Sequence, residues 1–357
     1  MNRYAVIMAG GIGERFWPRS RQNLPKQFLP LLGERSLLQQ SCERIQNLVS
    51  PENILVVTGR DHLSLAREQL PHLPETNFLS EPQGRNTAPC IGLAAVYLRR
   101  RDPDGIMLVF PADHLVQGRK DFTCCMEKAL ELSSSTDSLV TVGIIPTRPE
   151  TGYGYIEREE EAFPGTPPAY RVRQFVEKPD YHNAVQYLHS GRYLWNSGIF
   201  AWKVGLILEK MQKHLPDLYR GLEKIASGIG TAEEQNNLES IFPSLPAISV
   251  DYGVMEKETN LLVVQGDFGW DDLGSWSALA ECFSGDEAQT VGMGQHVGID
   301  TTGCLVYGEN SLIATLGVSN LVIVQEKDVV LVCPKERAQE VKKLVQEIKE
   351  RGMTQYL

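Results

Sequence analysis

The first 145 residues alternate between short apolar runs and stretches with helical spacing, and this alternation limits the possible folds more than any other feature. The apolar runs cover residues 4–9, 54–58, 106–110 and 139–144. The helical patterns cover residues 36–47, 61–70, 87–100 and 121–132. Strands that alternate with helices form parallel sheets with helices on both faces. We therefore predict an α/β fold whose ligands bind in the loops that follow the strands.

The C-terminal part of the chain has a different residue pattern. Residues 296–333 are rich in β-formers and interrupted by glycines, and residues 335–351 have the spacing of an amphipathic helix. We predict an α/β domain over residues 1–288 and a β-rich module with a terminal helix over residues 289–357. The module holds no obvious chemical group, so we expect it to serve in packing or oligomerisation.

Charge and cysteine content narrow the functional classes. The formal net charge is -10, whereas general nucleic-acid binders are more often basic, so we expect no nucleic-acid partner. The seven cysteines are odd in number and scattered, as is typical of thiols in a reducing compartment. No apolar run approaches the length of a membrane span, and the N-terminal run is too short for a signal peptide. We expect a cytoplasmic protein without a membrane partner.

The strongest local signal is the segment MAGGIGERFWP at residues 8–18. Three glycines, Gly10, Gly11 and Gly13, follow the first predicted strand directly. Glycines allow close approach of the backbone to a ligand, and successive N–H groups in such a turn bind anions. Arg15 and Lys26 add full positive charges that suit a polyphosphate. The alternative is a tight turn with two solvated cations. The order of residues fits neither a Walker loop nor a dinucleotide fingerprint.

Carboxylates follow two predicted strands, the run at residues 106–110 and a further apolar run at residues 261–265. Asp113 lies in FPADH, directly after the run 106–110, and Asp271 and Asp272 lie in GWDDLGSW at residues 269–276. Mg²⁺ prefers one or two carboxylates together with phosphate oxygens and water. One Asp from each loop would satisfy that preference, although each could instead cap a helix or form a turn.

Two further loops have polar groups that suit a sugar phosphate. Glu177 and Lys178 close a strand in FVEKP, where the carboxylate could accept hydroxyl hydrogen bonds and the ammonium could bind phosphate. Asn196, in WNSGIF, offers both a donor and an acceptor. The glycine-rich segment at residues 151–155, which contains Gly152, forms another backbone-exposing loop. In isolation, the first could be a surface charge pair and the second a simple turn.

Taken together, these segments resemble the sugar-1-phosphate nucleotidyltransferases, and among them most closely the guanylyltransferases that act on mannose 1-phosphate. The resemblance spans residues 4–276 and rests on an ordered set of motifs: GGIGERFWP with PKQF, EPQGRNTAP, FPADH, TGYGYIE, FVEKP, WNSGIF, VDYGVMEK and GWDDLGSW. Any one of them is weak, but the set in this order is specific. Glu14 departs from the family pattern, in which Thr or Ser often precedes the loop arginine.

The resemblance implies a nucleotide-binding α/β domain with a mixed, mostly parallel sheet, and a C-terminal left-handed β-helix fragment that supports oligomerisation, most simply as a dimer. It implies Mg²⁺ on Asp113 and Asp272, with Asp271 as the other candidate. The implied catalytic residues are Arg15, Lys26, Asp113, Lys178 and Asp272. The implied nucleotide-binding residues are Ala9, Gly10, Gly11, Gly13, Glu81, Gly84, Asn86 and Thr87, with Glu81 or Asn86 facing guanine. The implied sugar-phosphate residues are Gly152, Glu177, Lys178 and Asn196.

The implied reaction is transfer of GMP from GTP to mannose 1-phosphate by a single in-line displacement, which gives GDP-mannose and pyrophosphate. The nearest alternative is the same chemistry on another sugar phosphate, such as glucose 1-phosphate. An alternative from another class is a non-catalytic nucleotide-sugar sensor. Sensors tend to lose a metal or phosphate residue, whereas this chain keeps the whole implied set.

Overall fold

The computed structural model describes residues 1–309 and 311–357 and divides the chain into two compact units. The first unit consists of residues 1–10, 39–112 and 116–270. The second consists of residues 11–38, 113–115 and 271–357, so it combines the glycine loop with the C-terminal module. The predicted domains, residues 1–288 and 289–357, are continuous segments of the chain. The two compact units are instead defined by contacts in space, so each combines separate segments.

A nine-stranded sheet forms the centre of the first unit, in the order β3-β2-β1-β4-β9-β6-β10-β8-β7. Four strands come from the N-terminal region: β1 (Arg3–Ala9), β2 (Ile54–Gly59), β3 (Phe78–Glu81) and β4 (Ile106–Pro111). The others are β6 (Leu139–Ile144), β7 (Gly154–Phe163), β8 (Ala169–Glu177), β9 (Tyr193–Lys203) and β10 (Leu261–Gly266). Two short strands, β5 (Leu115–Val116) and β11 (Trp270–Asp271), lie outside this sheet.

The sheet is mixed. Strands β3, β2, β1 and β4 pair in parallel, as do β6 and β10, while β9 pairs antiparallel with both β4 and β6. Strands β1, β2 and β4 are buried almost throughout, which explains their uninterrupted apolar sequences. The parallel register places Ala9 beside Thr58, and Gly59 beside Glu81. The ends of β1 and β3 therefore lie at the same edge of the sheet.

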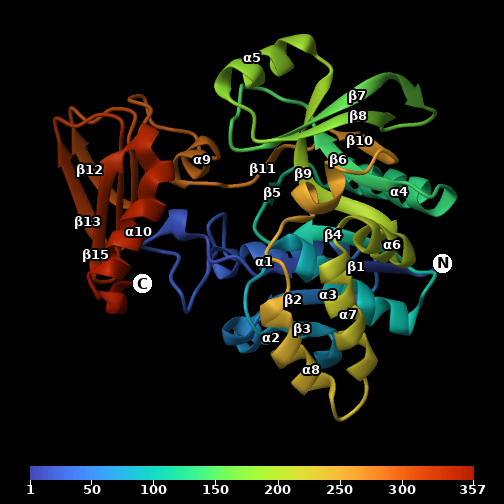
Figure 1. Ribbon diagram of the computed structural model, residues 1–357. Helices are drawn as coiled ribbons and strands as arrows, with labels where there is room; N and C mark the ends of the chain where they lie inside the picture. The colour runs from blue at the N-terminus through green and yellow to red at the C-terminus, as the bar shows by residue number, and fades with distance from the viewer. The chain divides into compact units, whose positions relative to one another are not determined.

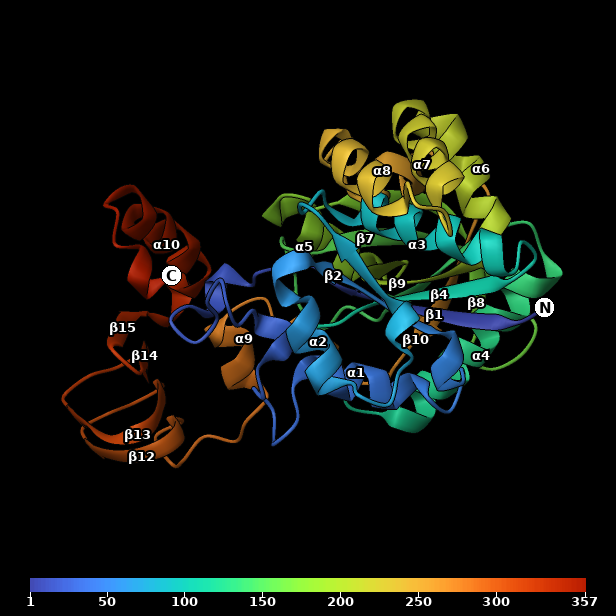
Figure 2. The same cartoon turned by 90° about the horizontal axis from the view of Figure 1, so that it is seen from below.

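Helices cover both faces of this sheet. Figure 2 shows α3, α6, α7 and α8 on one face and α4 on the other, which confirms the predicted flanking layers. One apolar core joins residues of α3, α6 and α7 to the sheet. The helices of this unit are α2 (Leu63–Gln69), α3 (Thr87–Arg101), α4 (Arg119–Ser135), α5 (Tyr181–Ser190), α6 (Val204–His214), α7 (Pro216–Gly228) and α8 (Glu234–Ile241), and α1 (Leu37–Ile45) begins at its border.

The second unit contains the four-stranded sheet β12 (Val291–Ile299), β13 (Leu305–Leu316), β14 (Leu321–Glu326) and β15 (Val329–Pro334). The first three strands pair in parallel and the last is antiparallel. Figure 1 draws these strands in red-brown beside α10 (Val341–Glu350), and α9 (Trp276–Glu281) precedes them in the chain. The parallel strands agree with the β-helix character predicted for this module. The predicted tail helix begins as a 3-10 segment, Lys335–Glu340, before α10.

One apolar core joins the glycine-loop residues to the C-terminal module within the second unit. Phe16 and Trp17 pack in a single cluster with Trp276, Tyr307 and Val341. The indole N–H of Trp276 donates to the backbone oxygen of Trp17 at 3.1 Å. No helix among residues 1–309 and 311–357 is long and apolar enough to cross a membrane.

Candidate functional site

A cavity of about 440 Å³ lies beside the glycine loop in the second unit. It brings together four residues that were predicted from separate motifs, namely Arg15, Lys26, Asp113 and Asp272. The first two are cations, the other two are carboxylates, and Gly13 and Gly274 also line the cavity. A pocket with this lining suits a polyphosphate together with a divalent cation.

The glycine loop is shaped by a steric requirement at Gly13. This residue has a φ of 73°, in the left-handed region, and a Cβ added to it would lie 2.3 Å from Cβ of Lys26. Any other residue would therefore clash with Lys26 and strain the backbone. The backbone N–H of Lys26 donates to Ile12 O at 3.2 Å, which closes the loop around that contact. A Cβ on Gly11 would meet no atom within 4 Å, so Gly11 leaves the loop backbone open.

Lys26 is buried at the centre of the charged groups. Its Nζ lies 2.9 Å from Oδ2 of Asp113 and 2.8 Å from the backbone oxygen of Asp272. Burial acts to raise the pKa of Asp113, but the charges of Lys26 and His114 outweigh it and the net pKa is lowered. Asp113 is therefore ionised at neutral pH. The guanidinium of Arg15 donates to the backbone oxygen of Gly274 at 3.3 Å.

The structure distinguishes the two adjacent aspartates at residues 271 and 272. Asp272 lines the cavity with Asp113. Oδ1 of Asp271 instead accepts the backbone N–H of Leu273 at 2.7 Å, where Leu273 has a φ of 47°. Asp271 thus stabilises a strained turn, and Asp272 is better placed to hold a metal. Asp113 and Asp272 form a candidate pair of metal ligands because both line the cavity; the described residues hold no group of three or more His, Cys, Asp or Glu that could bind a metal.

Glu81 ends β3 in the first unit and is the buried carboxylate nearest to Gly10. Its Oε2 lies 2.8 Å from the position of a Cβ added to Gly10, so any other residue there would displace the Glu81 carboxylate. Burial raises the pKa of Glu81 to about 7, a rise that a side-chain hydrogen bond with Cys90 partly offsets. Within residues 1–309 and 311–357, Oε1 of Glu81 has no hydrogen-bond partner. A buried acceptor without a hydrogen bond lowers the stability of the fold unless a ligand supplies a donor.

The loop after Glu81 is held by its own polar groups. Asn86 has a φ of 69°, and its side-chain oxygen accepts the backbone N–H of Thr87 at 2.8 Å. The Thr87 hydroxyl accepts the backbone N–H of Val250 at 2.9 Å. Gly84 has open space where a side chain would lie. Asn86 and Thr87 thus have structural hydrogen bonds, which favours Glu81 among the candidates for recognising the base. Ala9, at the end of β1, accepts the Thr58 hydroxyl through its carbonyl oxygen at 2.9 Å.

A second cluster of carboxylates in the first unit surrounds Asn196. The amide Nδ2 of Asn196 lies 2.9 Å from Oδ1 of Asp251 and 3.5 Å from Oε1 of Glu177. Burial raises the pKa of Glu177 to about 7, and the negative charge of Asp251 adds to the shift. Burial also raises the pKa of Asp251. Asp251 lies in the VDYGVMEK motif, but its role could not be predicted from sequence because its place beside Asn196 depends on the fold.

The backbone conformation around Glu177 and Asn196 shapes the same cluster of carboxylates. Lys178 has a φ of 52°, is exposed, and its charge lowers the pKa of Glu177 against the effect of burial. The glycine against the Glu177 carboxylate is Gly154, where a Cβ would clash with Oε1. Gly152, the glycine predicted from sequence, is exposed and donates its N–H to Glu150 at 3.0 Å. Asn196 lies within strand β9 and not in a turn, and Gly198, with a φ of 68°, follows it.

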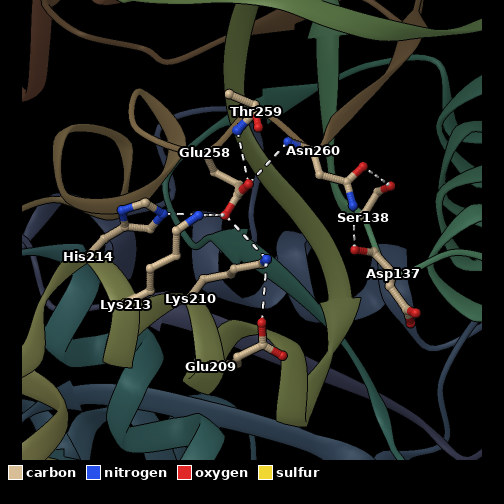
Figure 3. Close-up of polar contacts among 9 residues, drawn as sticks. All are labelled: Asp137, Ser138, Glu209, Lys210, Lys213, His214, Glu258, Thr259 and Asn260. Carbon is tan, nitrogen blue, oxygen red and sulfur yellow. Dashed lines mark hydrogen bonds and ion pairs between the residues drawn. The ribbon is translucent and has the colours of Figure 1, made fainter.

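Glu258 follows the segment Asp251–Met255 in the chain, and Figure 3 shows the polar contacts of its carboxylate. The Glu258 carboxylate accepts the backbone N–H groups of Thr259 and Asn260, at 3.0 and 3.2 Å. Its other oxygen lies 3.3 Å from both Lys210 Nζ and His214 Nε2. Burial acts to raise the pKa of Glu258, but these donors outweigh it and the pKa falls to about 2. Glu258 therefore attaches this segment to α6.

Comparison with known proteins identifies the family of the chain. A family model described as "Nucleotidyl transferase" matches residues 4–289, and one described as "MannoseP isomerase/GMP-like beta-helix domain" matches residues 294–348. Mannose-1-phosphate guanylyltransferases from Klebsiella pneumoniae and Escherichia coli are each 42% identical to the chain, over 98% of it and 75% of the relative. A solved structure from Thermus thermophilus, described as a mannose-1-phosphate geranyltransferase, is 41% identical, with a TM-score of 0.87 and coverage of 98% of this chain and 100% of that one.

Proposed function

Because the chain belongs to the mannose-1-phosphate guanylyltransferases of the nucleotidyl transferase family, we propose that it transfers GMP from GTP to mannose 1-phosphate. The products are GDP-mannose and pyrophosphate. The observation that carries the proposal is the single cavity lined by Arg15, Lys26, Asp113 and Asp272. The two cations would bind the triphosphate, and the glycine loop would add backbone N–H groups.

Glu81 is the proposed reader of the guanine base. Guanine presents the N1–H and N2–H₂ donors side by side, and an ionised carboxylate has two oxygens that accept both. The unpartnered, buried Oε1 of Glu81 supports this role, as does the adjacent Gly10, where a side chain would crowd Oε2 of the same carboxylate. Adenine and uracil offer no such pair of donors. Selectivity for GTP would then follow from the cost of leaving a buried carboxylate unpaired.

Mannose 1-phosphate is proposed to bind at the cluster around Asn196. Glu177 and Asp251 can accept hydrogen bonds from sugar hydroxyls, and the Asn196 amide lies between them. Lys178 carries an exposed positive charge next to Glu177 and would bind the sugar phosphate. The clustering of these groups supports the assignment. Gly152 stays a predicted member of this subsite.

The proposed reaction is one displacement at the α-phosphorus of GTP. An oxygen of the sugar phosphate forms a new bond to that phosphorus. The bond from the α-phosphorus to the bridging oxygen of the β-phosphate breaks, and this oxygen leaves on pyrophosphate with the electron pair. A phosphate monoester has its second pKa at about 6, so the attacking group is already deprotonated at neutral pH and no general base is required. Arg15 and Lys26 stabilise the leaving pyrophosphate, so catalysis is positioning plus electrostatics.

Mg²⁺ is the proposed cofactor, and the residues present fit it. Asp113 and Asp272 provide the one or two carboxylates that Mg²⁺ takes beside phosphate oxygens and water, and Asp113 is kept ionised by Lys26. When bound, Mg²⁺ would neutralise phosphate charge near the reacting phosphorus. Lys26, which contacts both Asp113 and the backbone of Asp272, positions this pair of ligands.

A homodimer through the C-terminal module is proposed as the assembled state. The β12–β15 sheet exposes apolar side chains that alternate with buried ones, as with Val330 and Val332 on either side of the buried Leu331. The other large apolar side chains exposed on this sheet are Val297, Ile299, Leu312 and Leu316. An exposed apolar face of this kind suits an interface with a second copy. We also propose residues 1–288 and 289–357 as the two domains, and the cytoplasm, where GTP is available, as the location.

The function is tested by incubating purified protein with GTP, mannose 1-phosphate and Mg²⁺ and following the products by ³¹P NMR. The proposal predicts the paired resonances of a diphosphate ester together with pyrophosphate. Protein with Asp113→Asn serves as the control, since it should fold and form neither product. Folded wild-type protein that binds GTP but forms no diphosphate ester would overturn the proposal.

A further inference from the structure

The cavity that holds Arg15 and Lys26 is also lined by a residue from the far end of the chain. Lys342 lies near the start of the C-terminal helix α10 and contributes to the same 440 Å³ space. The segments that form this lining all belong to the second unit. The residue has no place in any motif of the sequence, because its helix shows only a pattern of apolar packing.

Helix α10 is held against the glycine loop by specific contacts. Val341, the residue before Lys342, is buried in one cluster with Phe16 and Trp17. The indole N–H of Trp17 donates to the backbone oxygen of Tyr356, beyond the end of α10, at 2.7 Å. Because Phe16 and Trp17 directly follow Arg15, these contacts fix the helix relative to the loop cation. The Lys342 side chain is thus presented to the cavity by a packed element.

The charges of the cavity lining call for a further cation. Arg15 and Lys26 are the loop cations, but Lys26 is already within 2.9 Å of Asp113, and Glu14 adds another negative charge to the lining. A triphosphate brings several more negative charges into the same space. A flexible ammonium group suits such a site, since it can follow the phosphates as bonds break.

We propose that Lys342 is a further phosphate-binding residue, which contacts the β- and γ-phosphates of GTP and the pyrophosphate that leaves. This inference rests on the proposed function and extends it, because it makes the C-terminal module part of the catalytic apparatus. Binding of mannose 1-phosphate should be unaffected, since Lys178 is the cation proposed to bind the sugar phosphate. Lys342 is therefore expected to act on affinity for pyrophosphate and GTP and not on affinity for mannose 1-phosphate.

The test is calorimetric titration of full-length protein with pyrophosphate in the presence of Mg²⁺, which needs no turnover. Lys342→Ala should weaken pyrophosphate binding by about tenfold, and Lys342→Arg should restore most of the loss. The matched control is Lys343→Ala, on the same helix, since Lys343 is exposed and pairs with Glu340 at 2.9 Å. This control should bind pyrophosphate like the wild type. Unchanged binding in Lys342→Ala would overturn the inference.

A second comparison separates phosphate binding from simple neutralisation of Glu14. If Lys342 binds phosphate, Lys342→Ala should still weaken binding when Glu14→Gln is also present. Equal pyrophosphate affinity in Glu14→Gln and in the double variant would overturn the inference. Lys342 would then only offset the charge of Glu14. The outcome for the proposed function is separate. Wild-type protein that binds pyrophosphate but makes no GDP-mannose would contradict that function, while a weaker Lys342→Ala complex would still support this residue.

Discussion

Lys26 and Asp113 form an ion pair, with the ammonium nitrogen 2.9 Å from Oδ2 of the carboxylate, and the same nitrogen lies 2.8 Å from the backbone oxygen of Asp272. One buried cation therefore links the two residues that we assign to Mg²⁺. The pair also lowers the pKa of Asp113, against the desolvation of its carboxylate by the surrounding protein. Removing the charge of Asp113 should affect activity far more than stability.

Asp113→Asn should lower kcat by about a thousandfold, since it removes a metal ligand from a site where catalysis is mainly electrostatic. Thermal unfolding should shift by only a few degrees, because Asn can still accept a hydrogen bond from Lys26. Steady-state kinetics check the loss of kcat, and a thermal melt of the same preparation checks the small shift in unfolding temperature. A folded variant with near-normal kcat would remove Asp113 from the metal site.

Asp272 and Asp271 should respond differently to substitution. Asp272→Asn should lower turnover and raise the Mg²⁺ concentration needed for half-maximal rate, because Asp272 lines the cavity. Asp271→Ala should cost about 1 kcal/mol of stability, because it removes the acceptor for the Leu273 N–H, and should leave the Mg²⁺ requirement nearly unchanged. The turnover rate of both variants, measured across a range of Mg²⁺ concentrations, distinguishes the two aspartates. The opposite pattern would make Asp271 the ligand.

Glu81 should make GTP affinity depend on pH. Its pKa is raised to about 7, and guanine requires the ionised form, so KM for GTP should rise as pH falls below 7 and level off above it. Glu81→Gln should raise KM for GTP about 100-fold and remove this step, since its amide NH₂ would face the guanine donors. The pH profiles of KM for both proteins give the comparison. A variant that keeps the wild-type preference for GTP over ATP would reassign base recognition.

Asp251→Asn should move the pH dependence of mannose 1-phosphate binding. The pKa of Glu177 is about 7, partly because of the negative charge of Asp251, so its removal should lower that pKa. Ionised Glu177 accepts sugar hydroxyls best, so KM for the sugar phosphate should fall as pH rises, with a lower midpoint in the variant. The sugar phosphate titrates identically in both assays, so the difference reports Glu177. Coincident midpoints would show that the two carboxylates are not coupled.

Glu258→Gln should destabilise the protein most at neutral pH. The folded-state pKa of Glu258, about 2, is below its unfolded value of about 4.3, so the ionised group stabilises the fold above pH 4 and this contribution is lost as pH falls toward 2. Urea unfolding midpoints of wild type and variant should differ clearly at pH 7, differ about half as much at pH 3, and converge only near pH 2. A difference that is independent of pH would mean that packing, and not charge, accounts for the contribution of Glu258.

The sequence predicts the parallel half of the fold well, because buried parallel strands have uninterrupted apolar runs. The run at residues 139–144 matches β6, and the pattern at residues 87–100 matches α3. Strand β9 was not predicted because Asn196, Ser197 and Gly198 interrupt its apolar sequence and are typical of a turn. In the fold, Ser197 donates its hydroxyl to Val142 O at 2.6 Å, which satisfies the polar group inside the sheet. Tertiary contacts therefore override local preference there.

The candidate site also contains some residues that the sequence predicts and others that only the fold reveals. Arg15, Lys26, Asp113 and Asp272 could be predicted because each lies in a loop with its own residue pattern. Lys342 and Asp251 could not, because their roles come from where helix α10 and the segment after α8 lie in the fold. A lysine in an amphipathic helix is ordinarily a solvated surface residue. Only the cavity lining reveals that Lys342 shares a space with Arg15.

The most direct test of the account is pyrophosphate release by purified protein with Mg²⁺, measured with GTP, ATP, UTP and dTTP against mannose 1-phosphate and glucose 1-phosphate. The account predicts rapid release with GTP plus mannose 1-phosphate and at least tenfold slower release with every other pair. Faster release with another pair would contradict the assigned base and sugar. No release with any pair, from folded protein that binds GTP, would contradict catalysis itself.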